Sequence, residues 1–242
     1  METDCTLDPS QFNLEGYYLK HGFLSRQECK HLLSGISEYQ EKYTVPVVYR
    51  HRQGRSLSYK VIDGKEIQSS LPEIDQLYQD INTIINTSLG TAFTTLKSRQ
   101  TGVNVNITPP GGEYRWHYDR NEVTAILYLN EVAGGETECY PNYRIYLDNS
   151  RYSQLQQGLD YLLEVTRNFF GKQVLIKPQQ GSIFFMKGKH CLHSVQPVLG
   201  TSERINIIFA YDSPGASFTI ENSLNNYLYN QSSDISSDPN YR

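Results

Sequence analysis

Residues 114–132 read YRWHYDRNEVTAILYLNEV and join a pair of polar residues to the start of a strand pattern. This stretch places His117 and Asp119 two residues apart, and a run of branched and aromatic residues typical of a β-strand begins at Val123. Alternate side chains of an extended chain point the same way, so His117 and Asp119 can bind the same ligand, such as a metal ion. The pair alone is a weak signal, because a polar edge strand would show it too.

The strand-like pattern continues on both sides of this stretch. Short runs rich in branched and aromatic residues recur from about Thr101 onward, separated by the turn signals PPGG, AGG, PQQG and VLG. These runs, expected to be strands, are TGVNVNIT (101–108), VTAILYLNEV (123–132), KQVLIKP (172–178), GSIFFM (181–186) and RINIIFAYD (204–212).

Helical patterns occur before and within the series of strands. Ser25 and Glu28 form a capping box that opens a helix over about residues 26–39. Proline in the first turn suits a second helix over about 72–86, and a third pattern lies between 151 and 170, closed by glycine. The apolar stripes are Cys29, Leu32, Leu33 and Ile36; then Ile74, Leu77, Ile81, Ile84 and Ile85; then Leu155, Leu159, Leu162 and Leu163.

Two helices followed by many short strands indicate an α+β fold, a β-sandwich or jelly roll with helices on one face. The 242 residues fit one domain, with helical support and the first strands in 1–100, a jelly-roll core in 101–212 and a polar tail in 222–242. Residues 1 to about 12 are polar and expected to be loose. Helix 151–170 is interpreted as an insertion, either a lid over the pocket or a surface helix.

Composition narrows the class of protein. A net charge of -4 gives no electrostatic reason to expect nucleic acid or an anionic membrane as a partner. No apolar run approaches the roughly 20 residues that span a bilayer, and METDCTLDPS is no signal peptide, so a cytoplasmic location is expected. The four cysteines are scattered, which argues against a disulfide framework or a zinc knuckle.

The six histidines divide by context. His31 falls in the first helix as a surface or core-edge residue, and His21 and His51 fall in loop-like stretches, where a ligand role is improbable. The other three, His117, His190 and His193, belong to the strand region.

A second motif raises the weight of the first. The stretch KGKHCLHSVQPVLGTSERINIIFAYD places His193 soon after a predicted strand and Arg204 at the head of the next. Two imidazoles and one carboxylate on one face of a metal form the facial triad of non-haem Fe(II) oxygenases, which leaves coordination positions open. An arginine on the adjoining strand can then pair with the carboxylate of a bound co-substrate.

The sequence resembles the Fe(II)/2-oxoglutarate-dependent dioxygenases, on the branch similar to prolyl 4-hydroxylases. The ordered matches are HYD at 117–119, AILYLNEVAGGETECYP at 125–141, QQGSIFFM at 179–186 and HSVQPVLGTSER at 193–204. They cover roughly residues 101–212, whereas the first hundred residues share only a general helical support with the family and no ordered motif. The resemblance implies a double-stranded β-helix (jelly roll) core and an enzyme that uses Fe(II), 2-oxoglutarate and O2, with ascorbate as a candidate reductant.

Carried over by position, the resemblance implies that His117, Asp119 and His193 bind the iron and that Arg204 binds the C5 carboxylate of 2-oxoglutarate. His193 is preferred to His190 because Ser-Val-Gln-Pro-Val follows it, which leaves His190 to the pocket rim or to a supporting position. Relatives that halogenate carry a small residue in place of the aspartate, so Asp119 favours hydroxylation, or else desaturation or ring formation.

Further residues are candidates for the co-substrate pocket. Tyr128 matches a position where some relatives place a tyrosine hydroxyl on 2-oxoglutarate. Asn206 lies where other relatives carry serine or threonine, and this departure leaves its role open. Asn104 and Asn106 alternate on the first strand of the core and would also line the pocket.

The substrate is less constrained than the reaction. A small molecule, such as a free amino acid or a natural-product intermediate, is the expected substrate class, and a prolyl-type residue within a peptide is the alternative. The basic stretch YRHRQGR supplies Arg50, Arg52 and Arg55, which would either meet a substrate carboxylate or form a solvated loop.

Two other classes of protein stay open. A zinc hydrolase would also use two histidines and a carboxylate, with Glu113 or Glu122 as general base, but it gives no reason for Arg204 or Tyr128. A non-catalytic jelly-roll binding module would carry His117 and Asp119 as ordinary polar residues.

Overall fold

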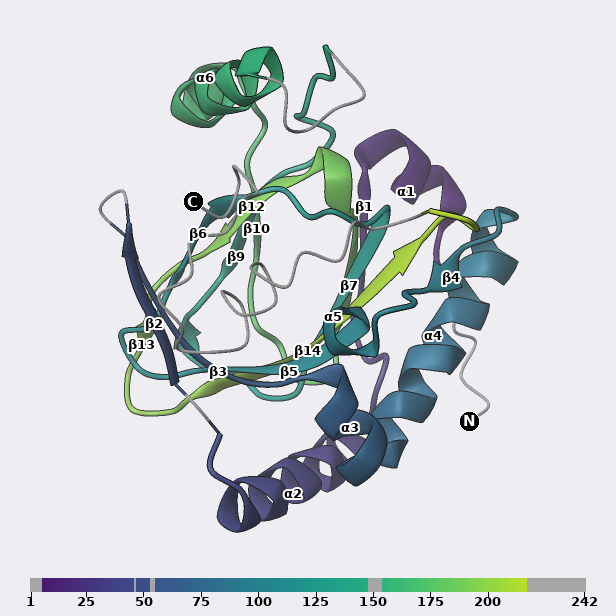
Figure 1. Ribbon diagram of the computed structural model, residues 1–242, viewed down its shortest axis with the longest axis vertical. Helices are drawn as coiled ribbons and strands as arrows, with labels where there is room; N and C mark the ends of the chain where they lie inside the picture. Colours follow the sequence, from purple (N-terminus) through teal and green to yellow (C-terminus); the bar gives the residue numbers. More distant parts are fainter. Residues whose placement is uncertain (1–5, 46, 53–54, 148–153, 217–242) are drawn as a thin grey trace.

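Two antiparallel β-sheets face each other at the centre of the molecule (Figure 1). The computed structural model describes residues 6–45, 47–52, 55–147 and 154–216. The arrangement confirms the predicted α+β fold with a jelly-roll core and supporting helices. The tail predicted over 222–242 lies outside the described residues.

The larger sheet has eight strands in the order β1-β11-β7-β14-β5-β3-β2, with β4 paired to β14. Its strands are β1 (Tyr17–Lys20), β2 (Val47–Arg52), β3 (Arg55–Ile62), β4 (Thr94–Thr95), β5 (Val103–Thr108), β7 (Val123–Tyr128), β11 (Ile183–Lys187) and β14 (Arg204–Asp212). Strand β14 lies between β7 and β5, so it occupies the middle of the sheet.

The smaller sheet has four strands in the order β10-β9-β12-β6. These are β6 (Tyr114–His117), β9 (Thr137–Tyr140), β10 (Val174–Ile176) and β12 (Leu192–Val195), and the separate pair β8 (Ala133–Gly134) and β13 (Val198–Leu199) connects the loops nearby. A register shift between β12 and β6 marks a β-bulge beside His117.

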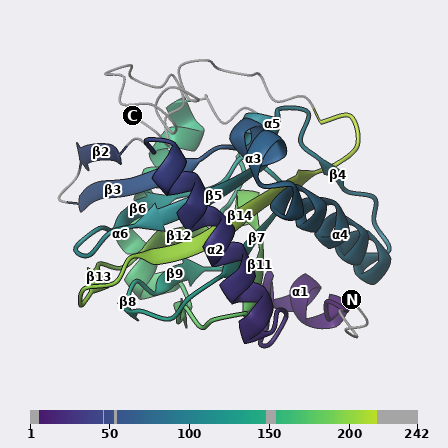
Figure 2. The ribbon, with the colours of Figure 1, turned by 90° about the horizontal axis from the view of Figure 1, so that it is seen from below.

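Helices α1 (Pro9–Glu15), α2 (Arg26–Lys42), α3 (Gly64–Ser70) and α4 (Pro72–Leu89) contribute to the apolar cluster on the outer face of the larger sheet, and Figure 2 shows α2 lying across it. Helix α2 begins at Ser25 with both hydrogen bonds of the predicted capping box, and α4 ends at Gly90 in the left-handed conformation. The structure also contains α5 (Arg99–Gly102), α6 (Gln154–Phe170) and the 3-10 turn η1 (Gly188–His190).

Strand alternation separates two faces of the larger sheet. Odd-numbered residues of β5 and β7 pack against the helices in one large apolar cluster, together with Ile36, Ile74 and Ile81. Even-numbered residues, such as Ile126 and Tyr128, face the smaller sheet, where they meet Cys139 and Ile176. The polar residues of β5 therefore lie between the sheets.

Helix α6 packs on the outer face of the smaller sheet. Trp116 alternates with His117 along β6, and the Arg167 guanidinium lies 4.4 Å from the Trp116 ring. A buried ion pair between Arg144 and Asp160 holds the helix in place. Since α6 and the histidine lie on opposite faces, the helix does not close over the metal-ligand side of the sheet.

The apolar stripe predicted for this helix is wrong at Leu155 and Leu162 and confirmed at Leu163. Leu155 and Leu162 are 75% and 54% exposed, whereas Gln156, Asp160 and Leu163 are buried. The helix is anchored through polar contacts, because the Gln156 side chain also bonds the backbone of Ile145 and Leu147. Periodicity found the helix and missed the face that it buries.

Two expectations for the first half of the chain are also wrong. The segment expected to be loose contains α1, which is capped by Asp8 and buries Leu7 and Phe12. His51 lies in strand β2 and not in a loop. Within the described residues, no helix has the length and apolar character needed to cross a membrane.

Candidate active site

His117, Asp119 and His193 come together between the two sheets. His117 ends β6 and lies opposite His193 on β12, and Asp119 follows two residues after the strand. The Asp119 Oδ1 atom is 3.6 Å from His117 Nε2 and 3.7 Å from His193 Nε2, and one ligand atom from each residue lies within 4.8 Å of the others. Three donors this close fit a single metal ion.

Both imidazoles present the same nitrogen to this centre. His117 Nδ1 lies 3.0 Å from the carbonyl oxygen of Arg115, and His193 Nδ1 lies 3.0 Å from that of Cys191. A carbonyl can only accept, so each Nδ1 carries the proton and each Nε2 keeps a lone pair for a metal. Burial, and then the neighbouring His193, lower the pKa of His117, which favours the neutral form that ligates.

Asp119 is held in place by its surroundings. The Thr124 hydroxyl donates to Oδ2 at 2.5 Å, and the Asp119 backbone amide donates to the Gly188 carbonyl at 3.1 Å. This leaves Oδ1 to face the histidines. No motif in the sequence points to Thr124, although it lies on the interior face of β7 two residues before Ile126.

Arg204 is buried on the same interior face of the larger sheet, with 2% exposure. Its guanidinium donates to Asn206 Oδ1 at 2.5 Å and to Thr137 Oγ1 at 3.1 Å, and it lies 5.3 Å from the Tyr128 ring. Burial lowers the pKa of Arg204, and the nearby Tyr128 partly offsets this effect. The guanidinium remains charged, as arginine does throughout proteins.

The surroundings of Arg204 fit an anionic ligand. Its Nε is buried without a hydrogen-bond partner, and the hydrogen bonds that the structure gives to its guanidinium go to the uncharged side chains of Asn206 and Thr137. A buried cation without a counter-charge is unfavourable, so the carboxylate of a bound diacid would complete the site. Predicted residues Tyr128 and Asn206 both belong to this cluster.

Thr137 is a member of the cluster that the sequence did not reveal. Its hydroxyl lies 2.8 Å from the Tyr128 hydroxyl, and it bridges that side chain to Arg204. The signal was the double glycine before it: Gly135 has φ +66, and a Cβ there would lie 2.9 Å from Arg204 Cδ. The glycine therefore makes room for the arginine.

The other expected pocket residues lie on the same interior face with different surroundings. Asn106 accepts a hydrogen bond from the Thr108 hydroxyl, and Asn104 stands opposite Ile208 in the sheet register. On the side of His117, the Tyr114 ring lies 4.8 Å from the imidazole. The side chains of Arg50, Arg52 and Arg55 lie outside the described part of the structure.

Several candidates lie apart from the metal group, which consists of His117, Asp119 and His193. His190 lies edge-on to the Tyr146 ring, and its carbonyl accepts the backbone amides of Tyr143 and Arg144. Glu122, considered as a general base, pairs with Lys189 at 2.7 Å. His190 is the last residue of η1, and its contacts are with residues 143–146.

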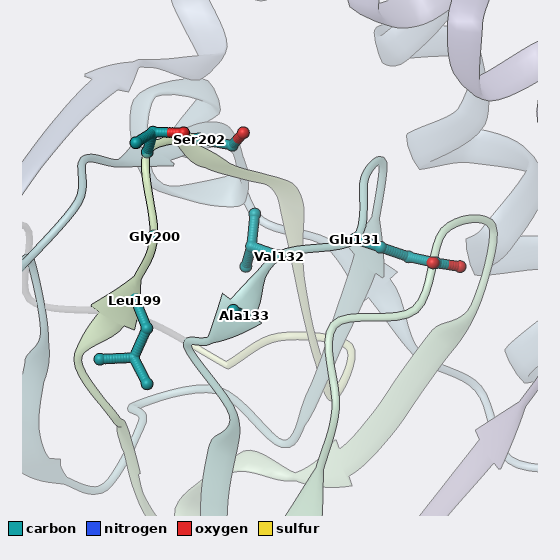
Figure 3. Close-up of a pocket in the computed structure, with 7 residues that line it drawn as sticks. Glu131, Val132, Ala133, Leu199, Gly200 and Ser202 are labelled. Atoms are coloured by element: carbon teal, nitrogen blue, oxygen red, sulfur yellow. The ribbon is translucent and has the colours of Figure 1, made fainter.

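A surface pocket elsewhere has no part in this site. It is lined by Glu131, Val132 and Ala133 from one loop and by Leu199 to Ser202 from another (Figure 3). The metal group and Arg204 do not line it.

Comparisons with known proteins agree with this geometry. Residues 103–211 match the family model of the 2OG-Fe(II) oxygenase superfamily. This matched range contains His117, Asp119, His193 and Arg204. No curated protein sequence matches the chain at a significant level.

Solved structures share the fold. The non-heme α-ketoglutarate-dependent carbocyclase SnoK from nogalamycin biosynthesis is similar at 15% identity, with a TM-score of 0.68 over 89% of this chain and 88% of SnoK. A Pseudomonas putida prolyl-4-hydroxylase is similar at 17% identity, TM-score 0.55, over 85% and 97% of the two chains. A Trichoplax adhaerens prolyl hydroxylase, solved with a hypoxia-inducible-factor peptide fragment, is similar at 18%, TM-score 0.59, over 86% and 88%.

The family match and the potential ligand group of His117, Asp119 and His193 both point to an oxygenase. They favour this class over the zinc hydrolase and the non-catalytic binding module. Residues 103–211 match the 2OG-Fe(II) oxygenase superfamily, and the protein is an oxygenase whose chemistry uses Fe(II), 2-oxoglutarate and O2.

Proposed function

We propose that this oxygenase hydroxylates an unactivated C–H bond of a small molecule, such as a free amino acid or a natural-product intermediate. The observation that carries the proposal is the shared interior of the two sheets, which holds both a group of three potential metal ligands and a buried arginine that pairs with no carboxylate within the described part of the chain. One oxygen atom of O2 would enter the substrate as a hydroxyl and the other would enter succinate, as 2-oxoglutarate loses CO2.

The roles of the residues follow from their contacts. His117, Asp119 and His193 would hold Fe(II), which supplies the activation of dioxygen when it is bound. Arg204 would fix the C5 carboxylate of 2-oxoglutarate through a charge-assisted contact, with the Tyr128 and Thr137 hydroxyls beside it. The protein's own contribution is thus orientation of the diacid and exclusion of water.

Asp119 bears on the type of oxidation. With the aspartate present, the protein provides three ligands and leaves no place for a halide in its stead. This supports hydroxylation, or else desaturation or ring formation, over halogenation.

The enclosure of the site supports a small substrate. The side chains of His117, Asp119 and His193 are only 10%, 16% and 6% exposed, so the centre is largely enclosed by the protein. The similarity to SnoK, whose name places it in the biosynthesis of a natural product, points the same way. A peptidyl, prolyl-type hydroxylase is the second candidate, favoured by the similarity to two prolyl hydroxylases.

A screen for succinate release tests the proposal. The purified protein, supplied with Fe(II), 2-oxoglutarate and air, is offered free amino acids, natural-product scaffolds and proline-containing peptides, with anaerobic and metal-free controls. We expect a small molecule to stimulate succinate release and to gain one oxygen atom by mass. Stimulation by peptides alone, with oxygen found in the peptide, would favour the second candidate.

A further inference from the structure

A chain of hydrogen bonds runs from Asn121 through Thr124 to Asp119. The Asn121 side-chain amide lies 2.8 Å from Thr124 Oγ1, and the Thr124 hydroxyl lies 2.5 Å from Asp119 Oδ2. Asn121 and Thr124 are buried, at 7% and 2% exposure. Neither residue reaches the other two members of the metal group through any contact that the structure gives.

The direction of these hydrogen bonds is fixed. The carbonyl of Val123, 2.7 Å from Asn121 Nδ2, can only accept, so the amide NH2 must face it. The same NH2 group then donates its other proton to Thr124 Oγ1. Since the hydroxyl has one proton and already accepts from the amide, that proton is directed to Asp119 Oδ2.

We propose that Asn121 and Thr124 are positioning residues that make Asp119 a one-oxygen ligand of the metal. With Oδ2 engaged, Oδ1 alone faces the Nε2 atoms of His117 and His193. A carboxylate free to turn would offer both oxygens and take a second coordination position. A one-oxygen ligand would leave more of the metal open to 2-oxoglutarate. This inference rests on the proposed function of the site.

The packing around these three residues leaves little room for another arrangement. Gly188 lies directly against them: a Cβ on it would be 2.6 Å from the Asn121 carbonyl oxygen, 2.8 Å from Thr124 Oγ1 and 3.0 Å from Asp119 Cβ. The Gly188 carbonyl also accepts the Asp119 amide. The carboxylate is therefore held from its backbone as well as from its outer oxygen.

Anaerobic binding of Co(II), and then of 2-oxoglutarate to the Co(II)-loaded protein, tests the inference without turnover. Thr124→Val removes the hydroxyl with little change of shape, Thr124→Ser restores it, and Thr83→Val removes a hydroxyl that bonds Gln79 within α4. We expect Thr124→Val to weaken 2-oxoglutarate binding about tenfold to a hundredfold, the range for a hydrogen bond to a charged group. Thr124→Ser and Thr83→Val should stay within about threefold of wild type.

A second variant covers the case in which Thr124→Val does not fold. Asn121→Leu removes the amide that orients the hydroxyl, and we expect it to weaken 2-oxoglutarate binding by less than Thr124→Val does. In both variants the affinity for Co(II) should change less than the affinity for 2-oxoglutarate. Wild-type affinity for 2-oxoglutarate in Thr124→Val, or in Asn121→Leu if only that variant folds, would overturn the inference. A wild-type protein that binds Co(II) but no 2-oxoglutarate would instead overturn the proposed function.

Discussion

His117 and His193 lie directly opposite each other on neighbouring antiparallel strands, with their ring centroids 4.0 Å apart. The backbone ladder between β6 and β12 therefore sets the spacing of the two imidazoles that we propose as metal ligands, although they are distant in sequence. The Nδ1 atom of each ring also lies within hydrogen-bond distance of the carbonyl two residues earlier in the chain, that of Arg115 or of Cys191. A site built on a sheet in this way is organised before the metal arrives.

Removal of the carboxylate ligand should abolish turnover. Asp119→Ala leaves two imidazoles, which bind a divalent metal much more weakly than three donors do. We expect no 2-oxoglutarate-dependent succinate release above background and a loss of Co(II) binding by calorimetry. Asp80→Ala is the matched control, since Asp80 only accepts from Gln76 on the surface of α4. Wild-type metal affinity in Asp119→Ala would refute the ligand assignment.

Removal of the buried guanidinium should affect the co-substrate and spare the metal. Arg204→Ala deletes the charge-assisted contact expected for the C5 carboxylate, so the apparent requirement for 2-oxoglutarate should rise by about tenfold to a hundredfold. The requirement for Fe(II) should change little. Initial rates at varied 2-oxoglutarate and at varied iron separate the two, and Arg99→Ala, which breaks an ion pair with Asp75, serves as control. The same dependence on 2-oxoglutarate in wild type and Arg204→Ala would contradict the assignment.

The sequence predicted most of what depends on strong local patterns. The capping box of α2 and the proline at the start of α4 appear where they were expected, and each of the five predicted strand runs contains a strand, although β10 has only three residues. The ordered motifs also named the histidines, the aspartate and the arginine that the fold brings together. These residues carry their signal in their own type and spacing.

The rest depended on partners distant in sequence. Thr124 and Thr137 look like ordinary strand residues, and their contacts with Asp119 and Arg204 exist only once the strands are paired. Helix α6 was misread because Asp160 is buried by its pairing with Arg144, which no periodicity within the helix reveals. The short strands β8 and β13 are too brief to leave a pattern.

The ion pair that anchors α6 should matter for stability and not for metal binding. Asp160→Asn leaves the buried Arg144 without a counter-charge, which costs about 3 kcal/mol or more in the free energy of unfolding. Because α6 lies on the face of the sheet opposite to the histidines, Co(II) affinity should stay at the wild-type value. Asp75→Asn makes the same change at a half-exposed pair, where about 1 kcal/mol or less is expected. A large loss of Co(II) affinity in folded Asp160→Asn would show that α6 shapes the metal site.

The cap of α2 should make stability depend on pH in a defined direction. Hydrogen bonds from the Ser25 amide and hydroxyl lower the pKa of Glu28, so the charged form is favoured in the folded state. The resulting stabilisation is fully present above the pKa of Glu28 in the unfolded chain and is lost as pH falls through the lower pKa of the folded state.

Glu28→Gln keeps an acceptor and removes the charge. Near pH 7 the variant should be less stable than wild type by roughly 0.5 kcal/mol, the usual size of a charge effect at a helix end. Urea unfolding across pH 3–7 should show the two proteins converge toward the acid end. Glu38→Gln, later in the same helix, should show no such convergence, and a gap for Glu28→Gln that widens as pH falls would contradict the prediction.

Anaerobic titration of the Fe(II)-loaded protein with 2-oxoglutarate, followed by visible absorption, tests the central claim most directly because it requires no substrate. We predict a new charge-transfer band that saturates at one 2-oxoglutarate per chain, is missing in Asp119→Ala and needs far more 2-oxoglutarate in Arg204→Ala. If the wild-type protein shows no band, or if Asp119→Ala shows the same band at the same concentration, the chain does not hold iron and 2-oxoglutarate as described.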